Sequence, residues 1–256
     1  MRKLIYPAVT LVAVFAVLTG VVYPFAVWAI GQGTMSYRAN GSFITRNGQT
    51  VGSALIGQSF ADKDGNPLPQ YFQPRPSAAG AGYDPTASAA SNLGPGDPRL
   101  VGFIPGFNSV GLDGNPSATN PFATKDDPYC VPTDDQGKPV TSPSADQKYT
   151  RNQDGSYACY SSTVPERAIA YRQLNGLNPG ATIPVDAVTA SNSGLDPDIS
   201  AANADLQAPR VAQARHLSVE RVLNLVKEHT TSRQLGFLGE QTVNVLDLNL
   251  ALDALR

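Results

Sequence analysis

The fold of this chain is decided first by residues 6–30, which read YPAVTLVAVFAVLTGVVYPFAVWAI. No charged residue occurs between Lys3 and Arg38. At about 1.5 Å per residue, a helix of this length covers roughly 37 Å, which is more than the hydrocarbon core of a bilayer needs. A helix also pairs its own backbone groups where there is no water. We therefore predict a transmembrane helix at residues 6–30, with a kink at Pro24.

A cleaved signal peptide is the alternative for this segment. Signal peptides have an apolar region of about 7–15 residues, and this run is longer, so an uncleaved anchor is favoured. The distribution of basic residues says little about the orientation of the helix in the membrane, because they lie on both sides of it, Arg2 before it and Arg38 after it. The lengths of the two flanks favour a short cytoplasmic tail at residues 1–5 and an extracytoplasmic domain at residues 31–256.

The rest of the chain is predicted to form an α+β domain with two ordered parts. The Asn-Gly pair at residues 47–48 indicates a β-hairpin within residues 42–60, because both residue types tolerate positive φ. Ser218 is a candidate helix N-cap, and the apolar spacing after it predicts an amphipathic helix to about His229. A strand is expected at residues 242–246. A short terminal helix is expected to bury three leucines: Leu248, Leu252 and Leu255.

The middle of the chain is predicted to be rich in loops. Residues 62–165 hold most of the 21 Pro and repeat Asp-Gly and Asn-Pro turn signals. Cys130 and Cys159 lie in this part. In an oxidising compartment they would close a loop of about 30 residues and stabilise the fold by roughly 3–4 kcal/mol. A disulfide between them is favoured over two free thiols.

Composition and motifs argue against several classes of function. A net charge of -2 provides no basic excess to neutralise the phosphates of nucleic acid. The Gly-x-x-x-x-Gly-Lys-Ser/Thr, Gly-x-Ser-x-Gly and His-Glu-x-x-His patterns are all absent. The two histidines, His216 and His229, are predicted to be solvated surface residues rather than catalytic bases. We therefore predict that the chain is not an enzyme.

Two acidic features are candidate cation sites. Residues 62–66 begin like a calcium loop, but the later ligands are missing at the required spacing, so a turn is predicted. Asp196 and Asp198 flank Pro197 shortly before a helical stretch led by Ser200. Carboxylates at such a place favour the exposed amides of a helix start. A cation-attracting role for these two aspartates remains the alternative.

Several ordered blocks of sequence resemble one family. The blocks are residues 40–42 (NGS), 51–60 (VGSALIGQSF), 71–78 (YFQPRPSA), 83–95 (YDPTASAASNLGP), 188–200 (VTASNSGLDPDIS), 207–215 (QAPRVAQAR) and 243–252 (VNVLDLNLAL). They resemble the C subunit of the Kdp-type potassium-transporting P-type ATPase, the KdpC family, and the similarity covers the anchor, about residues 40–102 and about residues 164–256. Residues 103–163, which hold both cysteines, are expected to be a loop-rich insertion without a family counterpart.

The resemblance implies a place in a four-subunit complex of the bacterial inner membrane. Its partners would be a channel-like potassium-binding subunit, a P-type ATPase subunit and a very small subunit. This chain would contribute one span, with its N-terminus in the cytoplasm and its main domain outside. ATP and potassium would be handled by the complex, and no cofactor is expected on this chain.

Two roles within such a complex remain open. The first is a catalytic chaperone that raises the ATP affinity of the pump subunit, since Gln207 matches the glutamine that the family links with nucleotide contact. An exported domain would place Gln207 across the bilayer from ATP. We therefore favour a packed amide at a helix break before Pro209.

The second role is assembly of the complex and control of potassium entry. Acidic residues are absent from residues 1–61, which leaves the remainder more acidic than the net charge of -2 implies. Such a surface would raise the local potassium concentration within a screening length of about 8–10 Å. Outside this family, the alternative is a free-standing, membrane-anchored, exported binding protein.

Overall fold

The structure is a computed structural model with two compact units, Met1–Leu55 and Ile56–Arg256, and each is considered by itself. Cys130 and the rest of residues 103–130 lie outside the described residues, as do parts of the predicted loop-rich segment after them. The structure describes residues 2–94, 97, 100, 131–138, 140, 149–153, 158–159 and 163–255.

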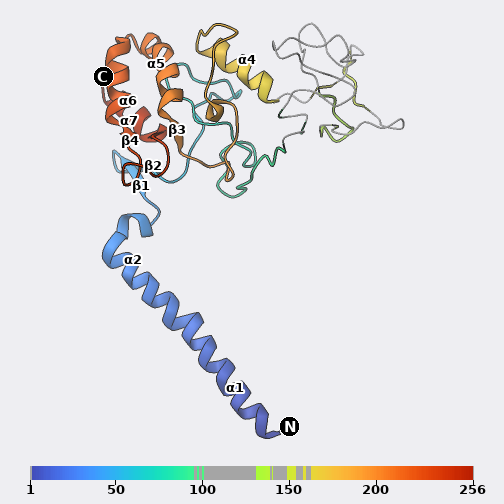
Figure 1. Cartoon of the computed structure of the whole chain (residues 1–256), viewed down its shortest axis with the longest axis vertical. Helices are drawn as coiled ribbons and strands as arrows, with labels where there is room; N and C mark the ends of the chain where they lie inside the picture. The colour runs from blue at the N-terminus through green and yellow to red at the C-terminus, as the bar shows by residue number, and fades with distance from the viewer. Residues whose placement is uncertain are drawn as a thin grey trace. The chain divides into compact units, whose positions relative to one another are not determined.

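The first unit begins with a long apolar helix, drawn in blue in Figure 1. It consists of α1 (Arg2–Val17), a π-helical turn η1 (Leu18–Val22) and α2 (Tyr23–Ala39). By length and composition, Leu4–Ala39 is able to cross a membrane, and its most apolar stretch is not buried against the protein. The predicted span of residues 6–30 lies within this helix, which extends beyond it at both ends.

Pro24 accounts for the local change of helix type. Proline has no N–H to donate, and its ring crowds the carbonyl one turn earlier. The widened turn η1 comes just before it, and the Tyr23 N–H donates to the Leu18 carbonyl across this turn. Such π-bulges are a known cause of helix kinks. A second irregularity, at Met35 (φ -147°, ψ 45°), was not expected from the sequence.

The β-hairpin is confirmed, although it is shorter than predicted. Strand β1 (Phe43–Arg46) pairs with antiparallel β2 (Gln49–Ser53), with one irregularity of register. Asn47 and Gly48 both have positive φ, 52° and 76°, as a two-residue hairpin turn requires. The hairpin belongs to the first unit.

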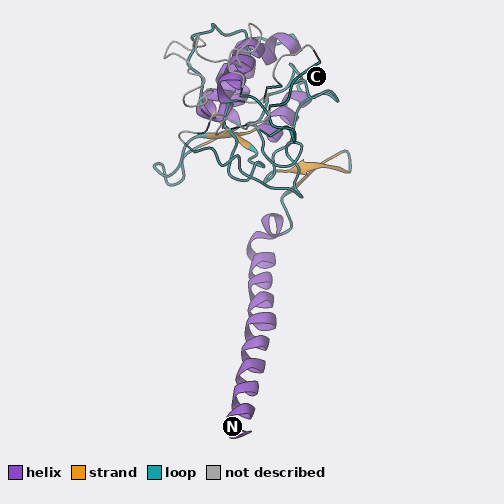
Figure 2. Cartoon of the chain, turned by 90° about the vertical axis from the view of Figure 1, so that its right-hand side faces the viewer, coloured by secondary structure: helices purple, strands orange, loops and turns teal. Residues whose placement is uncertain are grey.

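The second unit is a mixture of helices and short strands, which confirms the α+β class. Helices and strands are separated by long stretches of loop in Figure 2. The described elements are α4 (Val164–Leu174), the short helix η2 (Val185–Ala187), β3 (Asp198–Ser200), α5 (Ala201–Arg215), α6 (Val219–Glu228), β4 (Thr230–Thr231), β5 (Thr242–Asn244) and α7 (Val245–Ala254). The three strands among these described elements form one antiparallel sheet in the order β3-β5-β4.

The main core lies where α5, α6 and α7 pack together and cover the sheet (Figure 1). Alanines at positions 204, 208 and 212 lie four residues apart on one face of α5 and are fully buried, so neighbouring helices approach closely. The buried residues of this core are Phe72, Ile199, Ala204, Ala208, Val211, Ala212, Val222, Leu225, Val226, Val243, Val245, Leu248 and Leu252.

Helix α6 begins and ends as the sequence predicts. The Ser218 hydroxyl accepts from the Arg221 N–H at 3.3 Å and caps its N-terminus. The buried face differs from the one predicted by the apolar spacing of Val219, Val222, Leu223 and Val226. Leu225 is buried together with Val222 and Val226, while Val219 and Leu223 are 42% and 36% exposed.

The predicted strand at residues 242–246 is wrong at its C-terminal end. Strand β5 stops at Asn244, whose side chain accepts from the Asp247 N–H at 3.1 Å and caps α7. The β-branched and leucine residues that follow therefore start a helix, because an Asn cap satisfies the exposed amides of the first turn. Leu248 and Leu252 are buried in that helix, as predicted, and Leu255 packs at the edge of the core.

Candidate functional site

The most distinctive site in the second unit is built around residues 69–76, which we call the clamped segment. It lies outside the helices and strands, yet Phe72 at its centre is fully buried in the main core. A buried segment without a strand partner must find other partners for its backbone groups, because unpaired buried amides and carbonyls cost free energy. Side chains of α5 and α7 provide them.

Two side-chain amides pair with two consecutive residues of the clamped segment. Gln207 Oε1 accepts from the Gln73 N–H at 2.7 Å, and Gln207 Nε2 donates to the Gln73 carbonyl at 3.0 Å. Asn249 Oδ1 accepts from the Phe72 N–H at 2.9 Å, and Asn249 Nδ2 donates to the Phe72 carbonyl at 3.0 Å. Each amide thus offers the donor and acceptor that a neighbouring strand would offer.

Arg210, also on α5, holds the start of the clamped segment. Its Nη1 donates to the carbonyls of Pro69 at 2.5 Å and Tyr71 at 3.0 Å. Its other donors bond Asn175 Oδ1 at 2.9 Å and Gln207 Oε1 at 2.8 Å. These acceptors are neutral oxygens, and burial lowers the pKa of Arg210 to about 10. The guanidinium remains charged at neutral pH and is stabilised by hydrogen bonds rather than by a carboxylate among these partners.

Arg215 secures the clamped segment from the end of α5. Its Nε donates to the Gln70 carbonyl at 2.6 Å, and its Nη2 forms an ion pair with Asp253 on α7 at 2.9 Å. The guanidinium also lies over the Tyr71 ring, 4.8 Å from its centre. Helices α5 and α7 are therefore joined through the same segment.

The polar groups of the clamp continue into a buried network along α5. Asn203, Gln207 and Arg210 are spaced at i, i+4 and i+7, so they share one helix face. Asn203 Oδ1 accepts from Gln207 Nε2 at 2.9 Å and from the Tyr171 hydroxyl at 2.8 Å. Asn203 Nδ2 donates to Asp186 at 3.0 Å. Burial, and next the nearby charge of Asp186, raises the pKa of Tyr171.

Gln207, the candidate nucleotide residue, lies at the centre of the clamp and is 1% exposed. Both of its amide hydrogens and two lone pairs of its oxygen are used inside the protein. The predicted helix break is wrong, because Pro209 lies inside the continuous helix α5. In this geometry Gln207 packs and positions the clamped segment, and nucleotide contact stays an untested expectation.

Asp196 and Asp198 lie near each other, but their surroundings differ. Asp196 forms an ion pair with Arg75 at 3.0 Å and also accepts from the Asp198 N–H. Asp198 accepts from Thr242 at 3.3 Å, and burial, followed by the charge of Asp196, raises its pKa. The cap of α5 is Ser200 rather than either aspartate. Among the described residues, no group of three or more His, Cys, Asp or Glu is placed to hold a metal ion.

The predicted disulfide involves a residue that the structure does not describe. Cys159 forms an isolated β-bridge with Pro132, and its sulfur is disulfide-bonded rather than a free thiol. Cys130 lies outside the described residues. The pairing of these two cysteines therefore stays a prediction.

A groove of about 520 Å³ lies beside the clamped segment and α4. Gln73, Arg75, Tyr83 and Arg167 contribute to its walls. Arg75 is engaged by Asp196, and Arg167 donates to a backbone carbonyl at 3.2 Å. No His, Cys, Asp or Glu belongs to the described lining, so these walls offer no general base of those types.

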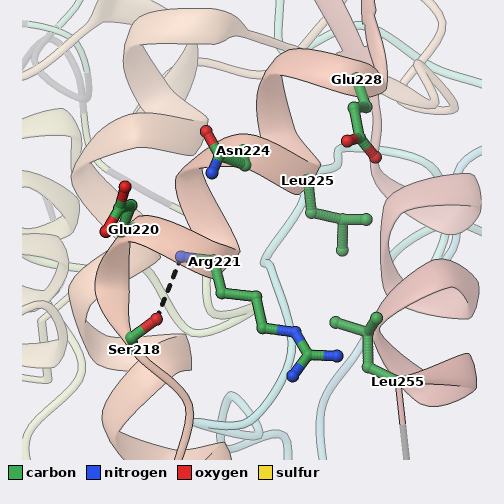
Figure 3. Close-up of a pocket in the computed structure, with 7 residues that line it drawn as sticks. All are labelled: Ser218, Glu220, Arg221, Asn224, Leu225, Glu228 and Leu255. Atoms are coloured by element: carbon green, nitrogen blue, oxygen red, sulfur yellow. Dashed lines mark hydrogen bonds between the residues drawn. The ribbon is translucent and has the colours of Figure 1, made fainter.

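A second depression, of about 320 Å³, lies between α6 and the end of α7. Figure 3 shows the side chains of Arg221 and Leu225 extending toward Leu255, with the capping bond from the Arg221 N–H to Ser218 beside them. Its carboxylates and single guanidinium do not form a constellation for nucleophilic catalysis. None of the residues singled out as sites from the sequence lies in it.

The chain combines a long apolar N-terminal helix with an α+β unit that is organised around a buried polar network. The family profile described as "KdpC: K+-transporting ATPase, c chain" matches residues 5–110 and 112–254. The chain therefore belongs to the KdpC family.

Curated relatives agree with this assignment, and each is named a potassium-transporting ATPase KdpC subunit. The protein of Mycobacterium bovis (strain BCG / Pasteur 1173P2) is 42% identical over 255 residues, which are 100% of both chains. The protein of Kineococcus radiotolerans is 42% identical over 233 residues, 91% of this chain and 84% of its own. That of Rhodospirillum rubrum is 39% identical over 253 residues, 99% and 96% of the two chains.

These matches correct one expectation. Residues 103–163 were expected to have no family counterpart, but the family profile continues through most of them. The Mycobacterium bovis relative also aligns along its whole length. The high Pro and Gly content of this segment distinguishes its composition from that of the flanking sequence, but members of the family can still have a corresponding segment.

Sequence reasoning singled out only Gln207 from the clamp. Asn203, Arg210, Arg215 and Asn249 belong to it equally. One available signal was a polar residue on a core-facing position of an apolar helix, as at Asn249 between leucines. Buried polar side chains need partners, so such a residue marks a site where the chain meets another backbone.

Proposed function

We propose that this chain is a non-catalytic, membrane-anchored accessory subunit of a potassium-transporting ATPase complex. The observation that carries the proposal is the match to the KdpC family, which runs from the apolar helix to residue 254. In this proposal, ATP hydrolysis and potassium selection belong to other chains: a P-type ATPase subunit and a channel-like subunit, with a very small subunit completing the complex.

Both histidines of the chain lie at helix ends. His216 is exposed and forms the C-cap of α5, and His229 forms the C-cap of α6. Neither makes a side-chain hydrogen bond to a serine or cysteine in the described part of the chain. A nucleophile needs a base within hydrogen-bond reach, and these two positions do not supply one.

For orientation, we propose a single span in the bacterial inner membrane with a cytoplasmic N-terminus and an extracytoplasmic main unit. The disulfide-bonded state of Cys159 supports this orientation, because disulfides persist in oxidising compartments. The test is to label an engineered cysteine near the C-terminus with a membrane-impermeant reagent in intact spheroplasts. Labelling before lysis supports the orientation, and labelling only after lysis contradicts it.

Between the two candidate roles, the geometry of Gln207 favours support of assembly and potassium entry over a catalytic chaperone. Its amide would have to give up four hydrogen bonds inside the protein before it could contact a nucleotide. Each buried group left without a partner costs about 1–3 kcal/mol. An ATP contact would therefore have to compensate for the opening of the clamp.

The decisive experiment is copurification of the full-length tagged chain from native membranes in mild detergent. A subunit of this complex should bring with it a large polytopic channel protein and a P-type ATPase in fixed ratio. A free-standing binding protein, the alternative, should purify alone. A tagged, unrelated single-span protein from the same membranes serves as the control for non-specific carry-over.

A further inference from the structure

The end of α2 folds back against the long apolar helix. Gln32 Nε2 donates to Asn40 Oδ1 at 3.1 Å, and Asn40 Nδ2 donates to Gln32 Oε1 at 3.0 Å. In a straight helix, residues eight positions apart are separated by about 12 Å along the axis. The break at Met35 allows the chain to turn (Figure 1). Ala39 also lies against Gly31, where an added Cβ would be 3.6 Å from the Ala39 Cβ. Asn40 therefore lies at the level of Gln32 along the helix.

This level is the outer edge of the predicted span at residues 6–30. Trp28 is four residues before Gln32, so the two share one face of the helix. Trp28 is 61% exposed, and tryptophans favour the boundary between lipid and water. At a tilt of about 20°, a helix that enters the hydrocarbon core at Tyr6 places Gln32 roughly 7 Å beyond the far edge of the core. The segment that folds back to Gln32 is therefore at the depth of the lipid headgroups.

Two aromatic side chains are exposed on this segment, residues 36–43, which we call the fold-back. Tyr37 is 57% exposed and Phe43 is 60% exposed. The Tyr37 hydroxyl donates to the Ser42 carbonyl at 3.0 Å, so both ends of the fold-back are tied together. The Cα of Phe43 is at most about 11 Å from that of Asn40, because only three residues separate them. Aromatic side chains of this kind fit a boundary that is apolar on one side and wet on the other.

The charge around the fold-back matches a layer of lipid phosphates. Residues 31–55 contain Arg38 and Arg46 and no Asp or Glu. Arg38 is exposed and lies next to Tyr37 in the fold-back. Basic side chains beside apolar ones are attracted to anionic lipid surfaces. In the proposed orientation these arginines lie on the outer side of the membrane, where short flanks ordinarily carry fewer basic residues. Attraction to lipid phosphates gives this charge a physical reason.

We propose that the fold-back is a second membrane contact, which rests on the outer headgroup layer of the bilayer that the apolar helix spans. This inference rests on the proposed single span and adds to it a lipid-binding surface outside the span. Tyr37 and Phe43 enter the boundary between acyl chains and headgroups, and Arg38 contacts lipid phosphate. The Gln32–Asn40 amide pair holds the fold-back in place, so that little conformational freedom is lost on contact with lipid.

The first test identifies what covers Phe43 in native membranes. A photoreactive amino acid is placed at position 43 of the full-length chain, and the covalent products are identified by mass after irradiation. A product with phospholipid is expected, and the same membranes without irradiation are the control. Products only with another polypeptide, only with a second copy of this chain, or with neither lipid nor protein would overturn the proposal.

The second test measures depth in vesicles of phosphatidylcholine and anionic phosphatidylglycerol that contain the full-length chain. Trp28 is the only tryptophan, so the double substitution Trp28→Phe and Phe43→Trp moves the fluorescent probe to the fold-back. Lipids brominated near the headgroup should quench the probe at position 43 more strongly than lipids brominated near the bilayer centre. Quenching of Trp28 in the unaltered chain but not of the probe at position 43 overturns this inference alone. Absence of quenching at both positions overturns the single span and, with it, the inference.

Two further substitutions in the chain with the probe at position 43 separate charge from geometry. Arg38→Gln should shift the ratio of lipid-contacting to free fold-back about fivefold toward the free state in anionic vesicles, and Arg38→Lys should restore it. Gln32→Ala should reduce the quenching because the amide pair is lost. Gln49→Ala is its control, since Gln49 is exposed on β2. Quenching that is equal in Gln32→Ala and Gln49→Ala, or that is unchanged by Arg38→Gln, would overturn the proposal.

Discussion

Gln207 pairs both ends of its side-chain amide with both backbone groups of Gln73, at 2.7 and 3.0 Å, although the two residues are 134 positions apart in the chain. This relationship makes the clamped segment part of the core without making it a strand. It also explains why a polar residue is buried on α5, beside the fully buried alanines of that helix. The requirement for a partner on every buried backbone group is met by side chains instead of by a sheet.

Replacing Gln207 with alanine should lower the free energy of unfolding of the full chain by about 2–4 kcal/mol, because four polar groups lose a hydrogen-bond partner at once. Thermal unfolding in detergent measures this. Gln213→Ala is the matched control, since Gln213 is exposed on the same helix. Equal melting temperatures for the two variants would show that the clamp contributes no stability.

Gln207 and Asn249 should be energetically coupled, because they hold consecutive residues of one segment. Once either amide is lost, the segment loosens and the second loss costs less. A double-mutant cycle with both alanine variants should therefore show a combined destabilisation smaller than the sum, by about 0.5–3 kcal/mol. Strict additivity would mean that Phe72 and Gln73 are held independently.

Gly57→Ala should destabilise the second unit by about 2–4 kcal/mol. A Cβ at this position would lie 2.5 Å from the Asp196 carbonyl oxygen and 2.5 Å from a Tyr83 ring carbon. The backbone carbonyl has little freedom to withdraw. Gly180→Ala is the control, because a Cβ there meets nothing within 4 Å, and it should change stability by at most about 1 kcal/mol. The prediction fails if both variants unfold at the same temperature.

Asp198→Asn should raise the melting temperature at pH 7. Burial, and next the charge of Asp196, raises the pKa of Asp198 above its ordinary 3.8 in the folded state. The folded protein therefore binds this proton more tightly than the unfolded chain does. The stabilisation by the protonated Asp198 carboxyl is fully present below pH 3.8 and is lost as the pH rises through the pKa of the folded state. The gain from Asn should shrink as the pH is lowered toward 3.8.

Asp84→Asn should change the stability at pH 7 in the opposite direction to Asp198→Asn. Hydrogen bonds from Thr86 lower the pKa of the Asp84 carboxyl. That contribution to stability is present above the ordinary pKa and is lost as pH falls. Its Asn variant should therefore be slightly less stable than the parent at pH 7. The same sign for both variants would contradict this account of the two aspartates.

The predicted bond between Cys130 and Cys159 can be measured by mass. Alkylation of the unfolded chain without reductant should add no label, and alkylation after reduction should add one label on each cysteine. Closing a loop of about 30 residues stabilises a fold by roughly 3–4 kcal/mol, so reduction should also lower the melting temperature. Labelling without reductant would exclude the bond.

Features that depend on neighbouring residues could be predicted from the sequence. The apolar run before Arg38, the Asn47-Gly48 turn and the Ser218 cap each act over a few residues, and the structure contains a helix, a hairpin and a helix start at those places. The end of β5 was missed because Asn244 has two local uses, in a strand and as a helix cap, and the cap was decided by the packing of α7.

By itself, the sequence determined an apolar helix long enough to span a bilayer, the α+β class of the rest and membership of the KdpC family. The spacing of apolar residues in helices, the residue types of turns and the family's sequence blocks can all be recognised within short stretches of the chain. Only the tertiary structure decided that Gln207 and Asn249 hold the backbone of residues 72–73, and that Arg210 and Arg215 hold the backbone of residues 69–71. Those facts depend on which distant segments meet, and long-range packing leaves no periodic trace in the sequence.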